Sequence, residues 1–222
     1  LGDVYKRQVL PYIWSNGGEI TDENYTKATG YLNSEATVNA VKMLADMYKN
    51  SEFTGFNSGD IPMTDGFGTG RYMMLLEGPW KTSELAGAYP DFKYATCEVP
   101  AGSAGSISVL GGEDIAMFNT ANKEGAWKFM KFMTSDFAEE EMAKCGQIPV
   151  NKEALDSDVV ANADYAPFLD AITTAKARPP VASWSEIDNE LTTAMTSIIS
   201  EGADVQETLD ALATKVDALL AE

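Results

Sequence analysis

Histidine is absent from this sequence of 222 residues, and basic residues are scarce. Lysine and arginine total 16 against 34 aspartates and glutamates, which gives a formal net charge of −18 at pH 7. Such a negative field repels nucleic acids and anionic membrane surfaces, so we expect neither as a partner. The missing histidine removes the usual metal ligand and the usual general base. We therefore expect no metal, no cofactor and no catalytic residues.

Cysteine and long apolar runs are also scarce. The two cysteines, Cys97 and Cys145, match no metal-site spacing, and we predict two small buried residues rather than a disulfide. No stretch approaches the roughly 18 consecutive apolar residues of a transmembrane helix. Hydrophobic residues nevertheless make up 45% of the chain and aromatic residues 10%, which predicts an ordered globular protein of one large or two small domains.

The most informative stretch is the sequence LLEGPW, which ends at Trp80. The apolar run 73–76 predicts a buried strand, and Pro79 ends it because proline has no N–H for a strand ladder. Trp80 then lies at the turn between this strand and the next helix. Ligands collect at the carboxyl ends of strands in α/β sheets. Trp80 is therefore either a core residue that caps the sheet or a flat platform for a ligand.

Helical and extended patterns alternate along the chain. Turn residues and hydrophobic periodicity predict helices over 34–50, 62–70, 81–88, 123–133, 135–145, 167–177, 184–200 and 205–220, and strands over 71–76, 92–99 and 109–118. Trp127, on the amphipathic helix 123–133, is expected in the core. The alternation of strands and helices predicts the α/β class.

Several short motifs occur in a characteristic order. They are WSNGG at 14–18, GRYMM at 70–74, EGPW at 77–80, LGGED at 110–114, KEGAWKFM at 123–130, IPVNK at 148–152 and RPP at 178–180. In this order and spacing they resemble the extracellular solute-binding proteins of ABC sugar importers, from about Leu10 to the end of the sequence. The resemblance implies a periplasmic-binding-protein-like fold, in which two α/β lobes close over a sugar at a hinge. It also implies chains near twice this length, so most of the N-terminal lobe is expected to be missing.

The resemblance divides the chain into segments. Residues 9–108 and 151–222 are expected to form the C-terminal lobe, and 109–150 a remnant of the N-terminal lobe with hinge crossings at both ends. The first eight residues, LGDVYKRQ, show no clear period and are interpreted as a non-native junction.

Five residues are the candidate ligand contacts. A sugar ring has apolar faces and a polar rim, so it suits an aromatic platform surrounded by hydrogen-bonding groups. The resemblance assigns the stacking role to Trp80, and Glu113 could accept hydrogen bonds from sugar hydroxyls with both carboxylate oxygens. Trp184, Trp14 and Asn16 are the further candidates. For each of these residues, packing in the interior or solvation at the surface remains the alternative interpretation.

These features predict a binding protein and not an enzyme. By resemblance it would deliver a sugar or oligosaccharide to the membrane permease of an ABC importer, outside the cytoplasm, anchored to the membrane surface only through a lipid on the missing N-terminus. One alternative is a binding protein for another small solute, such as a polyamine or a peptide. A second is a carbohydrate-active enzyme that uses Glu113 with another carboxylate.

Overall fold

The computed structural model describes residues 2–50, 60–119, 121–161 and 165–221, and for 2–8 the backbone alone. The chain folds as two compact units. Unit 1 consists of Leu1–Met63, Val99–Leu110 and Thr174–Glu222, and unit 2 of Thr64–Glu98 and Gly111–Thr173. Unit 2 therefore reaches beyond the segment 109–150 on both sides. The assignment of lobes to the chain stays a prediction.

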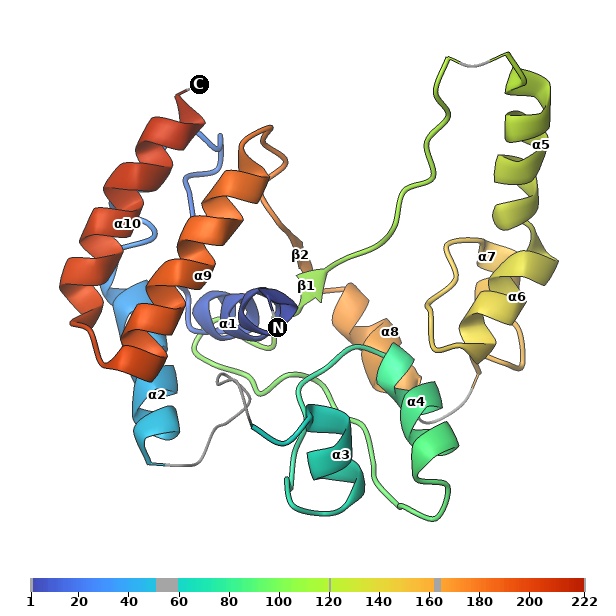
Figure 1. Ribbon diagram of the computed structural model, residues 1–222, viewed down its shortest axis with the longest axis horizontal. Helices are drawn as coiled ribbons and strands as arrows, with labels where there is room; N and C mark the ends of the chain where they lie inside the picture. The colour runs from blue at the N-terminus through green and yellow to red at the C-terminus, as the bar shows by residue number, and fades with distance from the viewer. Residues whose placement is uncertain (1, 51–59, 120, 162–164, 222) are drawn as a thin grey trace. The chain divides into compact units, whose positions relative to one another are not determined.

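Unit 1 is built from four long helices and a short parallel sheet. The helices are α1 (Gly2–Ser15), α2 (Glu35–Lys49), α9 (Trp184–Glu201) and α10 (Val205–Leu220). Figure 1 shows α9 and α10 side by side, and both contact α2. The sheet pairs β1 (Val109–Leu110) with β2 (Lys176–Ala177) in parallel. Residues 2–8, which belong to the segment interpreted as a junction, lie in helix α1, and that interpretation stays a prediction.

The helices of unit 1 follow from caps and apolar periodicity. Ser34 begins α2, because its side chain accepts a hydrogen bond from the backbone N–H of Thr37. The apolar residues of α2 then fall on one face, and Val41 and Leu44 have no exposed surface. The same core contains Leu209 of α10, which is also fully buried. The core of unit 1 therefore joins helices from both ends of the chain.

Unit 2 contains shorter helices and a smaller core. Its helices are α3 (Met63–Gly68), α4 (Trp80–Ala88), α5 (Lys123–Met133), α6 (Asp136–Lys144), α7 (Lys152–Leu155) and α8 (Ala166–Ile172). The buried residues Ala143, Val160 and Tyr165 form its hydrophobic cluster. The Tyr165 hydroxyl donates a hydrogen bond of 2.7 Å to the carbonyl of Ala143, which ties α8 to α6.

The three predicted strands were largely wrong. Residues 71–76 and 92–99 form no strand, and only Val109–Leu110 of the segment 109–118 enters a ladder. Met73 is 92% exposed, although its apolar run predicted burial. A strand requires hydrogen bonds to a neighbouring strand, and the sheet of the described residues contains β1 and β2 but neither of these segments. At 91–96 the side chains alternate between exposed and half-buried positions, and Phe92 packs edge-on against Phe67 of α3.

Two further burial predictions were wrong. Trp127 is 52% exposed, and no residue of α5 is fully buried. Cys97 and Cys145 are free and exposed. Cys97 lies in the stretch 92–99, which forms no strand, and Cys145 directly follows α6. In the part of the chain that the structure describes, no helix is long and apolar enough to cross a membrane.

Candidate functional site

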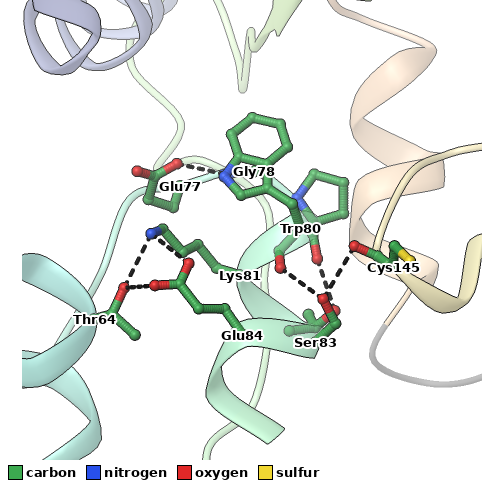
Figure 2. A network of polar contacts seen from close by, with 10 residues as sticks. Thr64, Glu77, Gly78, Trp80, Lys81, Ser83, Glu84 and Cys145 are labelled. Atoms are coloured by element: carbon green, nitrogen blue, oxygen red, sulfur yellow. Dashed lines mark hydrogen bonds and ion pairs between the residues drawn. The ribbon is translucent and has the colours of Figure 1, made fainter. Parts of the chain in front are cut away.

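Trp80 lies at the first turn of α4, in unit 2 (Figure 2). Pro79 precedes it with helical dihedral angles, φ −64° and ψ −22°, and proline suits this position because the first N–H groups of a helix have no partner within it. The backbone N–H of Lys81 donates to the carbonyl of Gly78 at 3.1 Å, and that of Thr82 to the carbonyl of Pro79 at 3.1 Å. The turn that carries Trp80 is thus closed by its own backbone.

The indole of Trp80 folds back over Gly78. A methyl group placed on the Cα of Gly78 would lie 2.1 Å from an indole carbon, closer than atoms can approach. The Gly78 N–H also donates to the Glu77 carboxylate at 3.1 Å, beside the ring in Figure 2. The indole is half-buried. Only glycine at position 78 permits this position of the ring.

Helix α6 ends directly against this turn. Its end is a Schellman motif, in which Gly146 N–H donates to Ala143 at 2.9 Å and Gln147 N–H donates to Met142 at 3.2 Å. Gly146 has φ +87°, a left-handed conformation that favours glycine. A methyl group on its Cα would lie 2.5 Å from the Cα of Trp80. Gly146 is therefore required both by its own backbone conformation and by the closeness of α4.

One side chain joins the end of α6 to the first turns of α4. The Ser83 hydroxyl donates to the carbonyl of Cys145 at 3.0 Å and lies 3.1 Å from the carbonyl of Trp80 (Figure 2). The Cys145 carbonyl is one of the last of α6 and has no partner within the helix. Ser83 thus holds the two helices at the point where Gly146 touches Trp80.

A second network joins α4 to α3. The hydroxyl of Thr64 donates to the Glu84 carboxylate at 2.7 Å and accepts from the Lys81 ammonium at 3.0 Å (Figure 2). Lys81 and Glu84 are also paired directly, at 2.6 Å. The Lys81 ammonium and then the Thr64 hydroxyl hold the pKa of Glu84 below its ordinary value. This Thr64–Lys81–Glu84 network thus attaches α4 to α3, whereas Ser83 attaches α4 to the end of α6.

The other candidate in unit 2 is Glu113. It lies in the stretch 111–119, in which every side chain is exposed. Its carboxylate is therefore exposed to solvent. Its predicted role toward a ligand stays a prediction. Within the described ranges, no group of three Cys, Asp or Glu side chains is placed to hold a metal ion.

Three candidates belong to unit 1. Trp14 is 3% exposed and packs in the main core, so its ring offers almost no surface as it stands. The Asn16 side chain donates to the carbonyl of Tyr12 at 2.8 Å, which caps the end of α1. Trp184 opens α9, is half-buried and packs against the same core. Their predicted ligand contacts stay predictions.

Sequence reasoning missed the contacts that hold Trp80 in place. Gly78 was recognised as a stop signal for a strand, and Gly146 as the end of a helix. The signal for a close backbone approach was present, since Gly146 follows a helix and Gly78 precedes a bulky ring. Which segment approaches Gly146 depends on long-range packing, and no local pattern reports it.

The curated relatives of this protein are longer than this chain. A protein of Brucella abortus (strain 2308) that is described as a binding protein is 30% identical over 226 aligned positions, which cover 98% of this chain and 53% of the relative. The chain thus spans about half the length of the curated relatives it matches.

Solved structures share the fold. A solute-binding protein of Thermotoga lettingae, solved with α-D-tagatose, superposes with a TM-score of 0.86 at 23% identity, over 97% of this chain and 57% of the other. Maltose-bound MalE3 of T. maritima gives 0.84 at 22% identity, over 96% and 57%. The model of the family described as bacterial extracellular solute-binding protein matches residues 8–167, and with this match over most of its length the chain belongs to that family.

Proposed function

We propose that this protein binds a sugar or oligosaccharide and delivers it to the permease of an ABC importer. The observation that carries the proposal is the Trp80 turn, in which a half-buried indole is held against Gly78 at the start of α4. An aromatic ring in a fixed orientation suits the apolar face of a sugar. The sugars held by the T. lettingae and T. maritima structures, which share the fold, support the same ligand class.

The remaining contacts follow from the resemblance. Glu113 would accept hydrogen bonds from sugar hydroxyls, and Trp184, Asn16 and Trp14 would complete the contacts, Trp14 only after a rearrangement that exposes its ring. In the complete protein, two hinged lobes would close over the sugar. Closure requires a ligand that binds the closed state more tightly than the open one, and contacts to both lobes provide this difference.

The cellular role follows from the family. Its description as extracellular supports a location outside the cytoplasm, and a lipid on a segment before this sequence would hold the protein at the membrane surface. The closed, sugar-loaded form would dock on the permease. The net charge of −18 opposes direct adsorption to anionic lipid, so a covalent anchor suits this role better than a charged surface.

The test is a calorimetric titration with maltose, α-D-tagatose and acarbose, run on the protein as its genome encodes it. We expect binding of at least one of these sugars, and Trp80→Ala should weaken it by about tenfold to a hundredfold because the stacking surface is lost. Trp127→Ala is the matched control, since this indole is 52% exposed on α5 and should leave binding unchanged. Equal losses in the two variants would contradict the proposal.

Further ligands and a hydrolysis assay separate the alternatives. Binding of spermidine or of a short peptide, with no response to any sugar, would favour the receptor for another solute. Release of new reducing ends from a bound oligosaccharide would favour a carbohydrate-active enzyme, and loss of that release in Glu113→Gln would assign the reaction to this carboxylate.

A further inference from the structure

We infer that Gly78 and Gly146, the glycine pair, are positioning residues that set the orientation of the Trp80 indole toward its ligand. The inference deepens the proposed function and rests on it for the ligand. It concerns two residues that cannot themselves stack on a sugar or donate a side-chain hydrogen bond. Their effect would be exerted entirely through Trp80.

The two glycines contact different parts of the same residue. Gly78 lies under the ring, where an added methyl group would meet an indole carbon at 2.1 Å. Gly146 lies against the backbone, where an added methyl group would meet the Trp80 Cα at 2.5 Å and the Pro79 carbonyl oxygen at 2.6 Å. A flexible side-chain end can rotate away from such a clash, but a Cα and a carbonyl of the first helical turn move only together with the helix. The ring therefore depends on Gly78, and the direction of the turn on Gly146.

Two polar networks make the position of α4 definite. Ser83 bonds to the Cys145 carbonyl at 3.0 Å beside Gly146, and the Thr64–Lys81–Glu84 network holds α4 to α3. Because α4 is fixed on both sides, a displacement at Gly146 cannot be absorbed by a free movement of the whole helix. It is transmitted to the residue in contact, which is Trp80. A site held by supporting contacts of this kind loses affinity when they shift by a fraction of the ligand's size.

The chain offers a matched control for each glycine. Gly70 follows α3 with φ +71°, similar to Gly146, but an added methyl group there meets nothing within 4 Å. Gly70→Ala thus introduces the same backbone strain without the contact. Gly87 lies in α4 itself, again with open space around it, and Gly87→Ala changes a glycine of this helix without touching Trp80.

The first measurement needs no ligand. The protein is labelled with fluorotryptophan, its four tryptophan signals are recorded by fluorine NMR, and the Trp80 signal is assigned by its disappearance in Trp80→Phe. Gly78→Ala and Gly146→Ala should shift the Trp80 signal more than those of Trp14 and Trp184. Gly70→Ala and Gly87→Ala should leave it in place. A Trp80 signal unmoved by both glycine-pair variants would overturn the inference.

The second measurement is affinity for the sugar of the panel that the unmodified protein binds most tightly. Both glycine-pair variants should weaken binding by about tenfold, and both controls should retain it. If Gly146→Ala does not fold, Ser83→Ala removes the adjoining hydrogen bond without strain. It should shift the same signal and weaken binding, and Ser83→Thr should restore both. A shifted signal with full affinity would refute the positioning role.

The inference and the proposed function can be disproved separately. If the unmodified protein binds no sugar of the panel, the proposed function fails and the positioning of a sugar fails with it. The NMR shifts then still decide whether the glycine pair holds the ring. If sugar binds and depends on Trp80 but not on either glycine, the function stands and the inference is wrong.

Discussion

Replacing Thr64 by valine removes one hydroxyl from the Thr64–Lys81–Glu84 network and keeps the branched shape of the side chain. Thr64 is 8% exposed, so no bulk water replaces the hydroxyl easily. Its two bonds, of 2.7 Å to Glu84 and 3.0 Å from Lys81, both involve charged groups. Such bonds contribute about 1.5–3 kcal/mol when buried. The Glu84 side chain is 46% exposed, so water compensates part of the loss, and we expect α4 to be destabilised by about 1–2 kcal/mol.

The assay is native-state hydrogen exchange of the α4 amides. A loss of 1–2 kcal/mol should speed their exchange by about 5- to 30-fold through local opening. The amides of α9, in unit 1, serve as the internal control and should keep their rates. A double-mutant cycle with Glu84→Gln measures the coupling, because the two residues share one bond. Exchange in α4 that stays unchanged, or that rises equally in α9, would refute the reasoning.

The same network predicts a pH dependence with a definite sign. Lys81 and Thr64 lower the pKa of Glu84 below its ordinary value of 4.5, so the folded state binds fewer protons than the unfolded state. The stabilisation is therefore fully present above about pH 4.5 and is lost as pH falls through the lower, folded-state pKa. In Thr64→Val this additional loss of α4 protection on acidification should be smaller, since one of the two causes of the shift is gone.

Three further predictions concern stability. Gly87→Ala should raise the free energy of unfolding by about 0.5–1 kcal/mol, because the site is an open helical position, and a lower thermal midpoint would contradict it. Partial desolvation raises the pKa of Asp217, but hydrogen bonds from Thr29 and Ala28 outweigh this effect and hold the pKa below its usual value. Asp217→Ala should therefore lower the free energy of unfolding at neutral pH and change it little below the folded-state pKa, as measured by urea titrations. Leu209→Ala, at a fully buried site, should cost about 2–5 kcal/mol by urea unfolding, and a cost near zero would place α10 outside the core.

Helices were predictable because their signals are local. The helix predicted over 205–220 is α10 to the residue, and that over 123–133 is α5. Serine caps at Ser34 and Ser135 set the starts of α2 and α6, where each hydroxyl accepts a backbone N–H of the first turn. All of these signals lie within a few residues of the element they define.

Strands and burial were not predictable in the same way. The apolar residues at 73–76 favour a strand, but a ladder requires a second segment, and the sequence of one segment does not show whether its partner is present. Trp127 illustrates the same limit, since an amphipathic face predicts burial only when another element covers it. At the site, Trp80 could be found from its motif. Its contact with Gly146, which lies 66 positions later in the sequence, could not be predicted.

Unit 1 is assembled from three separate stretches of chain, and this order has a consequence for biosynthesis. All of unit 2 is synthesised before α9 and α10. During that interval α1 and α2 have no permanent neighbour for the apolar residues that later contact α9, so the nascent chain carries them uncovered. Exposed apolar surface of this kind attracts chaperones and promotes aggregation. Slow translation through 111–173 should therefore reduce the yield of folded protein.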